Sequence, residues 1–337
     1  MDYAGLKKYL SRSFSRPLLI WGGPGTGKTE SVHRIGEELG LPVTSLIAST
    51  LEPSDIGGIP FRTENGVEFE PLKFFKDLSL SASSKEAVLF LDEINTTHPT
   101  MQAPLLRLIQ ENKAGQYVLP PSVRIIAAGN PPDTTTSGWE LTPPMANRFL
   151  HTAWVPSLSC WCPGKYASIR SYLIKRPGRF APELPKDWSS DHYAFPSPRS
   201  WALCGEIYDN FGFDFDLMAG AIGNGDVQEF KRYIEALDLL DPGSIVGNPR
   251  LLEGLPEDSA FANLISAMEF SLGKGVNEAY TFILKLGGFR RDWGRFVLSE
   301  VYSRGKVTTD IGMIGLINDC YGDWNTSIKE ELKKKGK

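Results

Sequence analysis

The first half of the chain alternates short apolar runs with amphipathic stretches of helical period. Two of the runs, Val88–Leu91 and Val123–Ala128, are almost continuously apolar, which is typical of strands buried on both faces. Strands that alternate with helices predict an α/β fold, with a parallel sheet between layers of helices. The five strands that we expect are Leu18–Trp21, Val43–Ala48, Ala87–Leu91, Val123–Ala128 and Phe149–Val155.

Two segments that interrupt this alternation have the pattern of β-hairpins. In Phe61–Phe69, the pair Asn65-Gly66 is a strong signal for a two-residue type I′ turn. The second segment, Gln116–Arg124, bends at the diproline that begins with Pro120 and leads into the fourth strand. We expect both hairpins to project and to contact another molecule.

Beyond Pro156 the strand signal fades, and apolar positions recur at helical spacing. The segment Leu158–Pro198 is rich in proline and serine, and we predict a connector with one short helix there. We expect Asp241-Pro242-Gly243 to end a later helix. We therefore divide the chain into an α/β domain, residues 1–156, and a helical region, residues 157–337. The helices that we expect are Tyr166–Lys175, Asp226–Leu240, Phe261–Leu272 and Asn277–Leu286.

Composition and charge narrow the classes of function. The chain has 337 residues, and its start, MDYAGLKKYLSRSF, lacks the apolar centre of a secretory signal. No stretch of about 18 apolar residues occurs, so we expect a cytoplasmic protein without a membrane segment. A net charge of −4 provides no general attraction for polyanions, so nucleic acid is not an expected partner.

The cysteines do not indicate a disulfide framework in a chain of this length, and we expect them to stay reduced. Cys160-Trp161-Cys162 could be half of a metal site, but no CxxC pair or close histidine completes it, so no metal is expected there. The four cysteines are Cys160, Cys162, Cys204 and Cys320.

A glycine-rich turn joins the first predicted strand to an amphipathic helix that opens at Lys28. Its sequence, GGPGTGKT, has the Walker A spacing, in which backbone N–H groups and a helix N-terminus surround nucleotide phosphates. Lys28 would contact the β- and γ-phosphates of ATP, and the Thr29 hydroxyl would bind Mg²⁺. The alternative is a ligand-free turn between strand and helix. The residues expected to bind ATP are Gly22, Gly23, Pro24, Gly25, Thr26, Gly27, Lys28, Thr29 and Asp92.

Polar residues follow two more of the predicted strands. The third strand ends in Asp92-Glu93, a Walker B pattern in which Asp92 would hold Mg²⁺ with Thr29, and Glu93 would polarise the attacking water. The fourth leads to Asn130, which can orient that water because parallel strands end at one edge of the sheet. The alternatives are a helix N-cap for the acidic pair and a turn asparagine before proline.

These motifs resemble those of the AAA+ ATPases, and within them the MoxR-like branch. The resemblance runs from Pro17 to about Trp201 and implies a P-loop core with a five-stranded parallel sheet, followed by a smaller all-α lid domain. The segments that carry it are GGPGTGKT, Ser49–Gly58, LFLDEIN, AAGNPP, Trp139–Phe149 and Pro198–Trp201.

The resemblance also implies residue roles and partners. Asn130 is similar to sensor 1, Arg148 to an arginine finger that acts on the neighbouring subunit, and Arg199 to sensor 2 on the lid. Without it, Arg148 would read as a surface ion-pair residue and Arg199 as part of a helix cap. Both hairpins would face the pore of a ring, a hexamer by resemblance, and grip a protein client. MoxR-like ATPases resemble chaperones that work with a separate protein carrying a von Willebrand factor type A domain.

Three hypotheses of function follow. The first is a ring-forming Mg-ATPase that remodels or activates a protein client. The second is a nucleic-acid motor or loader, which the acidic residues Glu64, Glu68 and Glu70 of the first hairpin disfavour because they would repel phosphates. The third is a nucleotide-gated binding scaffold in which Glu93 is idle. We prefer the first, because a competent residue occupies every expected catalytic position.

Overall fold

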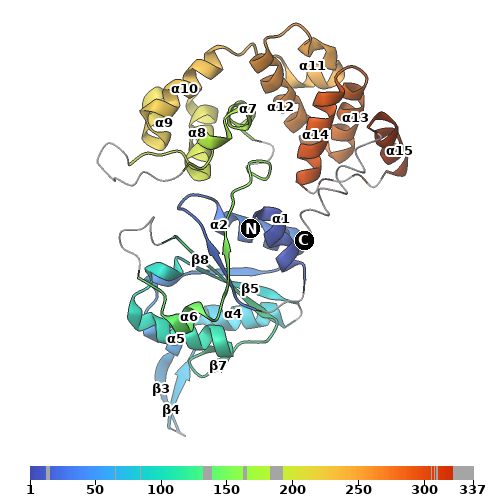
Figure 1. Ribbon diagram of the computed structural model, residues 1–337. Coiled ribbons are helices and arrows are strands. Elements are labelled where there is room, and N and C mark those ends of the chain that lie inside the picture. The colour runs from blue at the N-terminus through green and yellow to red at the C-terminus, as the bar shows by residue number, and fades with distance from the viewer. Residues whose placement is uncertain are drawn as a thin grey trace. The chain divides into compact units, whose positions relative to one another are not determined.

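The computed structural model describes residues 1–12, 16–64, 66–83, 85–131, 139–161, 165–182, 193–304, 306, 308 and 310–321. These residues form two compact units, the first from Met1 to Pro156 and the second beginning at Ser157. The first contains a parallel sheet, and the second is helical (Figure 1).

The centre of the first unit is a five-stranded parallel sheet with the order β2-β5-β8-β1-β9. The predicted α/β fold is confirmed, and each predicted strand is present with ends within two residues of those expected. The apolar runs of β5 and β8 are explained by their burial along almost their whole length. The strands are β1 (Leu18–Trp21), β2 (Val43–Ile47), β5 (Ala87–Asp92), β8 (Val123–Gly129) and β9 (Leu150–Ala153).

Helices cover this sheet and are joined to it by specific contacts. Arg124 at the start of β8 is 3% exposed, and its guanidinium donates a hydrogen bond to Leu10 O at 2.8 Å, which fixes the end of the first helix. The described helices of this unit are α1 (Tyr3–Leu10), α2 (Lys28–Leu39), α3 (Pro53–Gly57), α4 (Lys73–Ala82), α5 (Pro99–Glu111) and α6 (Pro143–Ala146), with the short η1 (Ala48–Thr50) and η2 (Ile94–Thr96).

The first predicted hairpin is confirmed, and it projects away from the sheet (Figure 1). Its strands, β3 (Ile59–Thr63) and β4 (Gly66–Glu70), are antiparallel. Thr63 lies opposite Gly66, so Gly66 is a strand residue and not, as predicted, the second residue of the turn. Asn65, on which the prediction rested, is outside the described residues.

The second predicted hairpin was placed wrongly. The hairpin pairs β6 (Lys113–Ala114) with β7 (Tyr117–Val118), whereas the diproline turn leads into β8, which pairs with β5 and β1. The turn depends on a tertiary contact: a Cβ at Gly115 would lie 2.1 Å from Gly57 O, and the φ of Gly115 is +59°. Only glycine suits that position.

The second unit has two apolar centres. One packs around Tyr172, Trp201 and Phe230, and the other around Ile265 and Phe282. The described helices are α7 (Ala167–Lys175), η4 (Pro177–Arg179), α8 (Pro198–Phe211), α9 (Phe215–Ile222), α10 (Asn224–Glu235), α11 (Pro242–Gly247), η6 (Pro249–Leu252), α12 (Glu257–Lys274), α13 (Val276–Gly287), α14 (Arg291–Ser303) and α15 (Ile311–Cys320).

The predicted helices of this unit are present, but two helix ends were wrong. The helix predicted to begin at Phe261 begins at Glu257. The helix expected to run to Leu240 ends at Glu235, and Asp241 instead begins α11, where its side chain accepts a hydrogen bond from Ser244 N at 2.7 Å. The sequence Asp-Pro-Gly suits either role, since aspartate is also a favoured N-cap and proline a favoured first helical residue.

Four charged side chains join three helices of the second unit. Arg170 on α7 contacts Glu269 on α12 at 2.9 Å and Glu300 on α14 at 3.2 Å. Arg304 donates to both carboxylate oxygens of Glu269, at 2.9 and 2.7 Å. Arg170 and Glu269 are 0% and 6% exposed, so this charged cluster is an internal part of the packing.

Cys204 and Cys320 are free thiols, Cys160 is buried, and Cys162 is outside the described residues. Burial raises the pKa of Cys204 to about 12, so its thiol is protonated and unreactive near neutral pH. No cluster of three or more potential metal-ligating acidic, histidine or cysteine side chains occurs in the described part of the chain. In the same part, no helix is long and apolar enough to cross a bilayer.

Candidate active site

The glycine-rich turn between β1 and α2 is held by contacts at several points. Gly22 N donates to Gly129 O at 3.1 Å, and the Thr26 hydroxyl donates to Gly23 O at 2.7 Å. Trp154 Nε1, which follows β9, donates to Thr26 O at 3.0 Å. The turn also has φ angles of +71° at Gly25 and +83° at Gly27, which favour glycine at both positions.

Lys28 opens α2 and is buried, with 8% of its surface exposed. Its Nζ donates to Gly22 O at 2.6 Å, to Gly23 O at 3.0 Å and to Asn130 Oδ1 at 3.0 Å. The ammonium group therefore lies inside the loop that a phosphate would enter, next to the amide that ends β8. Carbonyl oxygens are weaker partners for a cation than phosphate oxygens, so these contacts can be exchanged for a ligand.

Thr29 and Asp92 meet at the carboxyl ends of β1 and β5. Thr29 Oγ1 donates to Asp92 Oδ2 at 2.5 Å, and both side chains are half-buried. A hydroxyl and a carboxylate are hard oxygen donors, and Mg²⁺ binds through one or two protein oxygens completed by water and substrate phosphates. The donor set thus fits Mg²⁺ in company with a nucleotide.

Glu93 lies at the turn after β5 in an unusual backbone conformation. Its φ of +55° is left-handed, which is uncommon for a residue other than glycine and is found at functional turns. Its exposed carboxylate accepts a hydrogen bond from Ser49 Oγ in η1 at 3.1 Å, while its N–H donates to Asp92 Oδ1 at 2.9 Å. Glu93 is therefore beside the Mg²⁺ candidate residues, with its side chain held from the loop after β2.

Asn130 is fixed by a residue that the motif reasoning did not single out. The side chain of Asn95 in η2 forms two hydrogen bonds with the Asn130 backbone. Asn95 is 3% exposed. Ser49 was likewise missed as a partner of Glu93, although both residues lie inside the quoted family segments. Neither contact has a spacing signal, since the partners come together only in the folded sheet.

The two arginines differ in their surroundings. Arg148 follows α6 and is half-buried, and its Nε donates to Gln110 Oε1 on α5 at 3.2 Å. Arg199 is exposed in the first turn of α8, in the second unit. The cap of α8 is Ser197, whose hydroxyl accepts from Ser200 N, so Arg199 is not the cap. The catalytic roles of both arginines stay predictions.

Comparison with known proteins agrees with this geometry. Residues 17–149 match the family model described as AAA domain (dynein-related subfamily). The match begins just before β1 and ends before β9, so it includes the turn with Lys28, the Asp92-Glu93 pair and Asn130. This part of the chain is therefore similar to an AAA domain.

Three curated proteins share short similar regions. Midasin of Giardia intestinalis is 27% identical over 146 residues, which are 41% of this chain and 3% of midasin. The transcriptional activator RocR of Bacillus subtilis (strain 168) is 32% identical over 123 residues, 34% of this chain and 26% of RocR. The ATPase family gene 2 protein homolog B of Bos taurus is 32% identical over 100 residues, 28% of this chain and 12% of that protein. The matches thus span about a quarter or less of each relative.

Proposed function

We propose that this chain is a Mg²⁺-dependent ATPase that hydrolyses ATP at the Walker A edge of its AAA domain. The observation that carries the proposal is the meeting of four expected residues at one sheet edge, Lys28 with Asn130 and Thr29 with Asp92. The AAA-domain match over residues 17–149 and the ATPase named among the relatives support the same activity.

Hydrolysis of a phosphoanhydride depends on positioning and charge stabilisation more than on covalent catalysis. Lys28 would exchange its loop carbonyls for the β- and γ-phosphates, where negative charge develops. Glu93 would accept a proton from the attacking water, which Asn130 would orient, and the products would be ADP and inorganic phosphate. When bound, Mg²⁺ neutralises phosphate charge, and Thr29 and Asp92 are the residues that would hold it.

The assembly we propose is a ring, a hexamer by resemblance to MoxR-like ATPases, with ATP at the seam between copies. Arg148 would act on the ATP of the neighbouring copy, and Arg199 on the lid would contact the nucleotide as well. Arg148 Nε donates to Gln110 on α5 at an exposed position. This supports a role on the neighbouring copy, because the Arg148 side chain lies at the surface of its own copy. An arginine supplied in this way contributes about 10³ to 10⁵ in rate.

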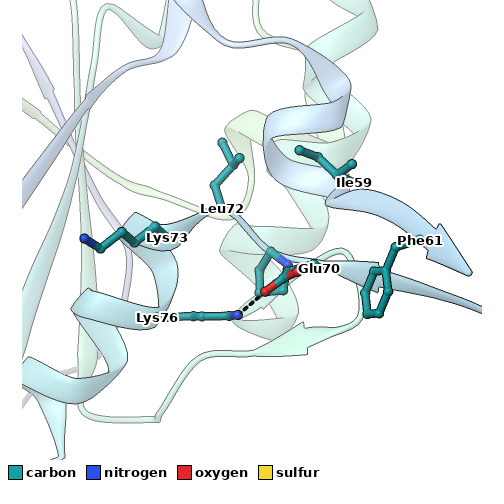
Figure 2. Close-up of a pocket in the computed structure, with 7 residues that line it drawn as sticks. Ile59, Phe61, Glu70, Leu72, Lys73 and Lys76 are labelled. Atoms are coloured by element: carbon teal, nitrogen blue, oxygen red, sulfur yellow. Dashed lines mark hydrogen bonds and ion pairs between the residues drawn. The ribbon is translucent and has the colours of Figure 1, made fainter. Parts of the chain in front are cut away.

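The partner we propose is a protein client, engaged by the β3–β4 hairpin and recruited through a separate protein with a von Willebrand factor type A domain. Ile59 and Val67 of the hairpin are 56% and 63% exposed, and Phe61 is 41% exposed. A cavity of about 380 Å³ lies at the hairpin base, where Lys76 and Glu70 point toward one another and pair at 2.5 Å (Figure 2). Exposed apolar side chains on a projecting hairpin are available for protein contacts. Purification of the endogenous complex tests this partner; a co-purifying nucleic acid instead would favour the motor hypothesis.

ATP turnover of Glu93→Gln tests the activity. The substitution keeps the size of the side chain but removes the base, so we expect ATP binding near the parental affinity and turnover lower by about 10² to 10⁴. Ser49→Ala is the matched control, because it removes the partner of the carboxylate and leaves the carboxylate itself. Parental turnover in Glu93→Gln, with normal binding, would contradict the proposal.

A further inference from the structure

Asn95 is a buried amide that lies behind the proposed catalytic edge. It belongs to η2, directly after Asp92 and Glu93, and 3% of its surface is exposed. Its Nδ2 donates to Asn130 O at 2.8 Å, and Asn130 N donates to its Oδ1 at 3.0 Å. Both polar groups of the side chain are thus bonded to the backbone of one residue, at the end of a different strand.

We propose that Asn95 is a positioning residue that sets the direction of the Asn130 side chain for ATP hydrolysis. The inference rests on the proposed function. Two hydrogen bonds, to the N–H and to the carbonyl oxygen of Asn130, restrict its backbone and thereby the direction of its side chain. That side chain reaches Lys28 Nζ at 3.0 Å, so the amide of Asn95 bears on the placement of the water-orienting amide and on one contact of the lysine.

The packing around the two hydrogen bonds between Asn95 and the Asn130 backbone, here called the clamp, supports a specific role for Asn95. A Cβ at Gly129 would lie 2.8 Å from Asn95 Oδ1 and 2.9 Å from Trp21 Cζ3, so glycine lets the amide approach the strand end. The Asn95 backbone oxygen also accepts a hydrogen bond from Trp139 N at 2.7 Å. A buried amide whose groups are all bonded is rigid, and loss of it leaves backbone groups without partners.

The helical unit offers a matched control for this clamp. Asn263 on α12 is 0% exposed, its Oδ1 accepts from Leu240 N at 2.8 Å, and its Nδ2 donates to Asp238 O at 2.7 Å. It makes the same kind of contact with backbone groups, within the second unit. Asn263→Ala should therefore lower the melting temperature without lowering the maximal turnover of ATP.

The test measures kcat at saturating ATP and the affinity for a non-hydrolysable ATP analogue on the full chain. We expect Asn95→Ala to lower kcat about 10- to 100-fold, a cost typical of a displaced catalytic group, with analogue affinity nearly unchanged. Because Asn95 acts through Asn130, the double variant Asn95→Ala/Asn130→Ala should turn over no slower than Asn130→Ala alone.

The proposal is overturned if Asn95→Ala keeps the parental kcat, or if the two losses multiply in the double variant. Should Asn95→Ala fail to fold, Asn95→Asp keeps the acceptor for Asn130 N and takes its place. If the parental chain did not hydrolyse ATP, the proposed activity would be contradicted, but the role of Asn95 in holding Asn130 would not. Amide hydrogen exchange at Asn130 then measures directly whether Asn95 holds the Asn130 backbone. Exchange should accelerate in the Asn95 variant and not in Asn263→Ala. Unchanged exchange in the Asn95 variant would contradict the proposal.

Discussion

The edge of the parallel sheet and the charged cluster of the helical unit use similar side chains in opposite ways. At the sheet edge, Lys28 rests on loop carbonyls and an amide, while Glu93 is exposed. In the helical unit, Arg170 and Arg304 converge on Glu269, and all three are buried. Charges that pair with one another inside a protein serve packing, whereas a lysine that opens a helix beside a glycine-rich turn is placed to take a charged ligand.

The largest expected effect separates activity from stability at the sheet edge. Lys28→Ala removes the cation that would meet the phosphates, so we expect ATP turnover to fall by about 10² to 10³ while the melting temperature changes little. Lys113→Ala is the control, because Lys113 pairs with Glu111 on the surface of the same unit. If Lys28→Ala hydrolysed ATP as fast as Lys113→Ala, Lys28 would not be needed for hydrolysis, and the contrast with the buried charges of the helical unit would be contradicted.

The next effect concerns stability in the helical unit. Arg304→Ala removes one of the arginines that pair with the buried Glu269, so we expect a loss of about 3 to 5 kcal/mol in the free energy of unfolding. Arg290→Ala, which removes an exposed pair with Asp292, should cost about 1 kcal/mol or less. Urea unfolding of the two variants measures the difference, and equal losses would show that the cluster is not a packing element.

The smallest effect is on the acid stability of the helical unit. The hydrogen bond from Ser244 N lowers the pKa of Asp241 below its ordinary value of 3.8. Its contribution is therefore present above that value and is lost as the pH falls through the lower, folded-state pKa. Asp241→Asn keeps a helix cap but cannot titrate, so we expect a slightly lower melting temperature at neutral pH and a shallower fall in acid. An identical acid profile would contradict this assignment.

The features that could be predicted from the sequence are those with local causes. The apolar runs and the turn chemistry of GGPGTGKT define the strands and the nucleotide edge within a few neighbouring residues. The features that were missed depend on the fold. The turn at Gly115 requires its contact with Gly57, and Asn95 acts on Asn130, which is 35 positions away. A single asparagine after a Walker B pair has no distinctive spacing, so only the folded sheet reveals its partner.

The central claim is that ATP is cleaved at a seam to which two copies contribute. The most direct test mixes Lys28→Ala with Arg148→Ala in equal amounts and measures ATP turnover. Each variant alone should be almost inactive. In a mixed ring, a Lys28→Ala copy can supply Arg148 to the ATP site of a neighbouring Arg148→Ala copy, and random mixing gives this arrangement at roughly one seam in four. We predict that the mixture recovers up to about a quarter of the parental rate. A mixture that stays as inactive as its parts would contradict the shared seam.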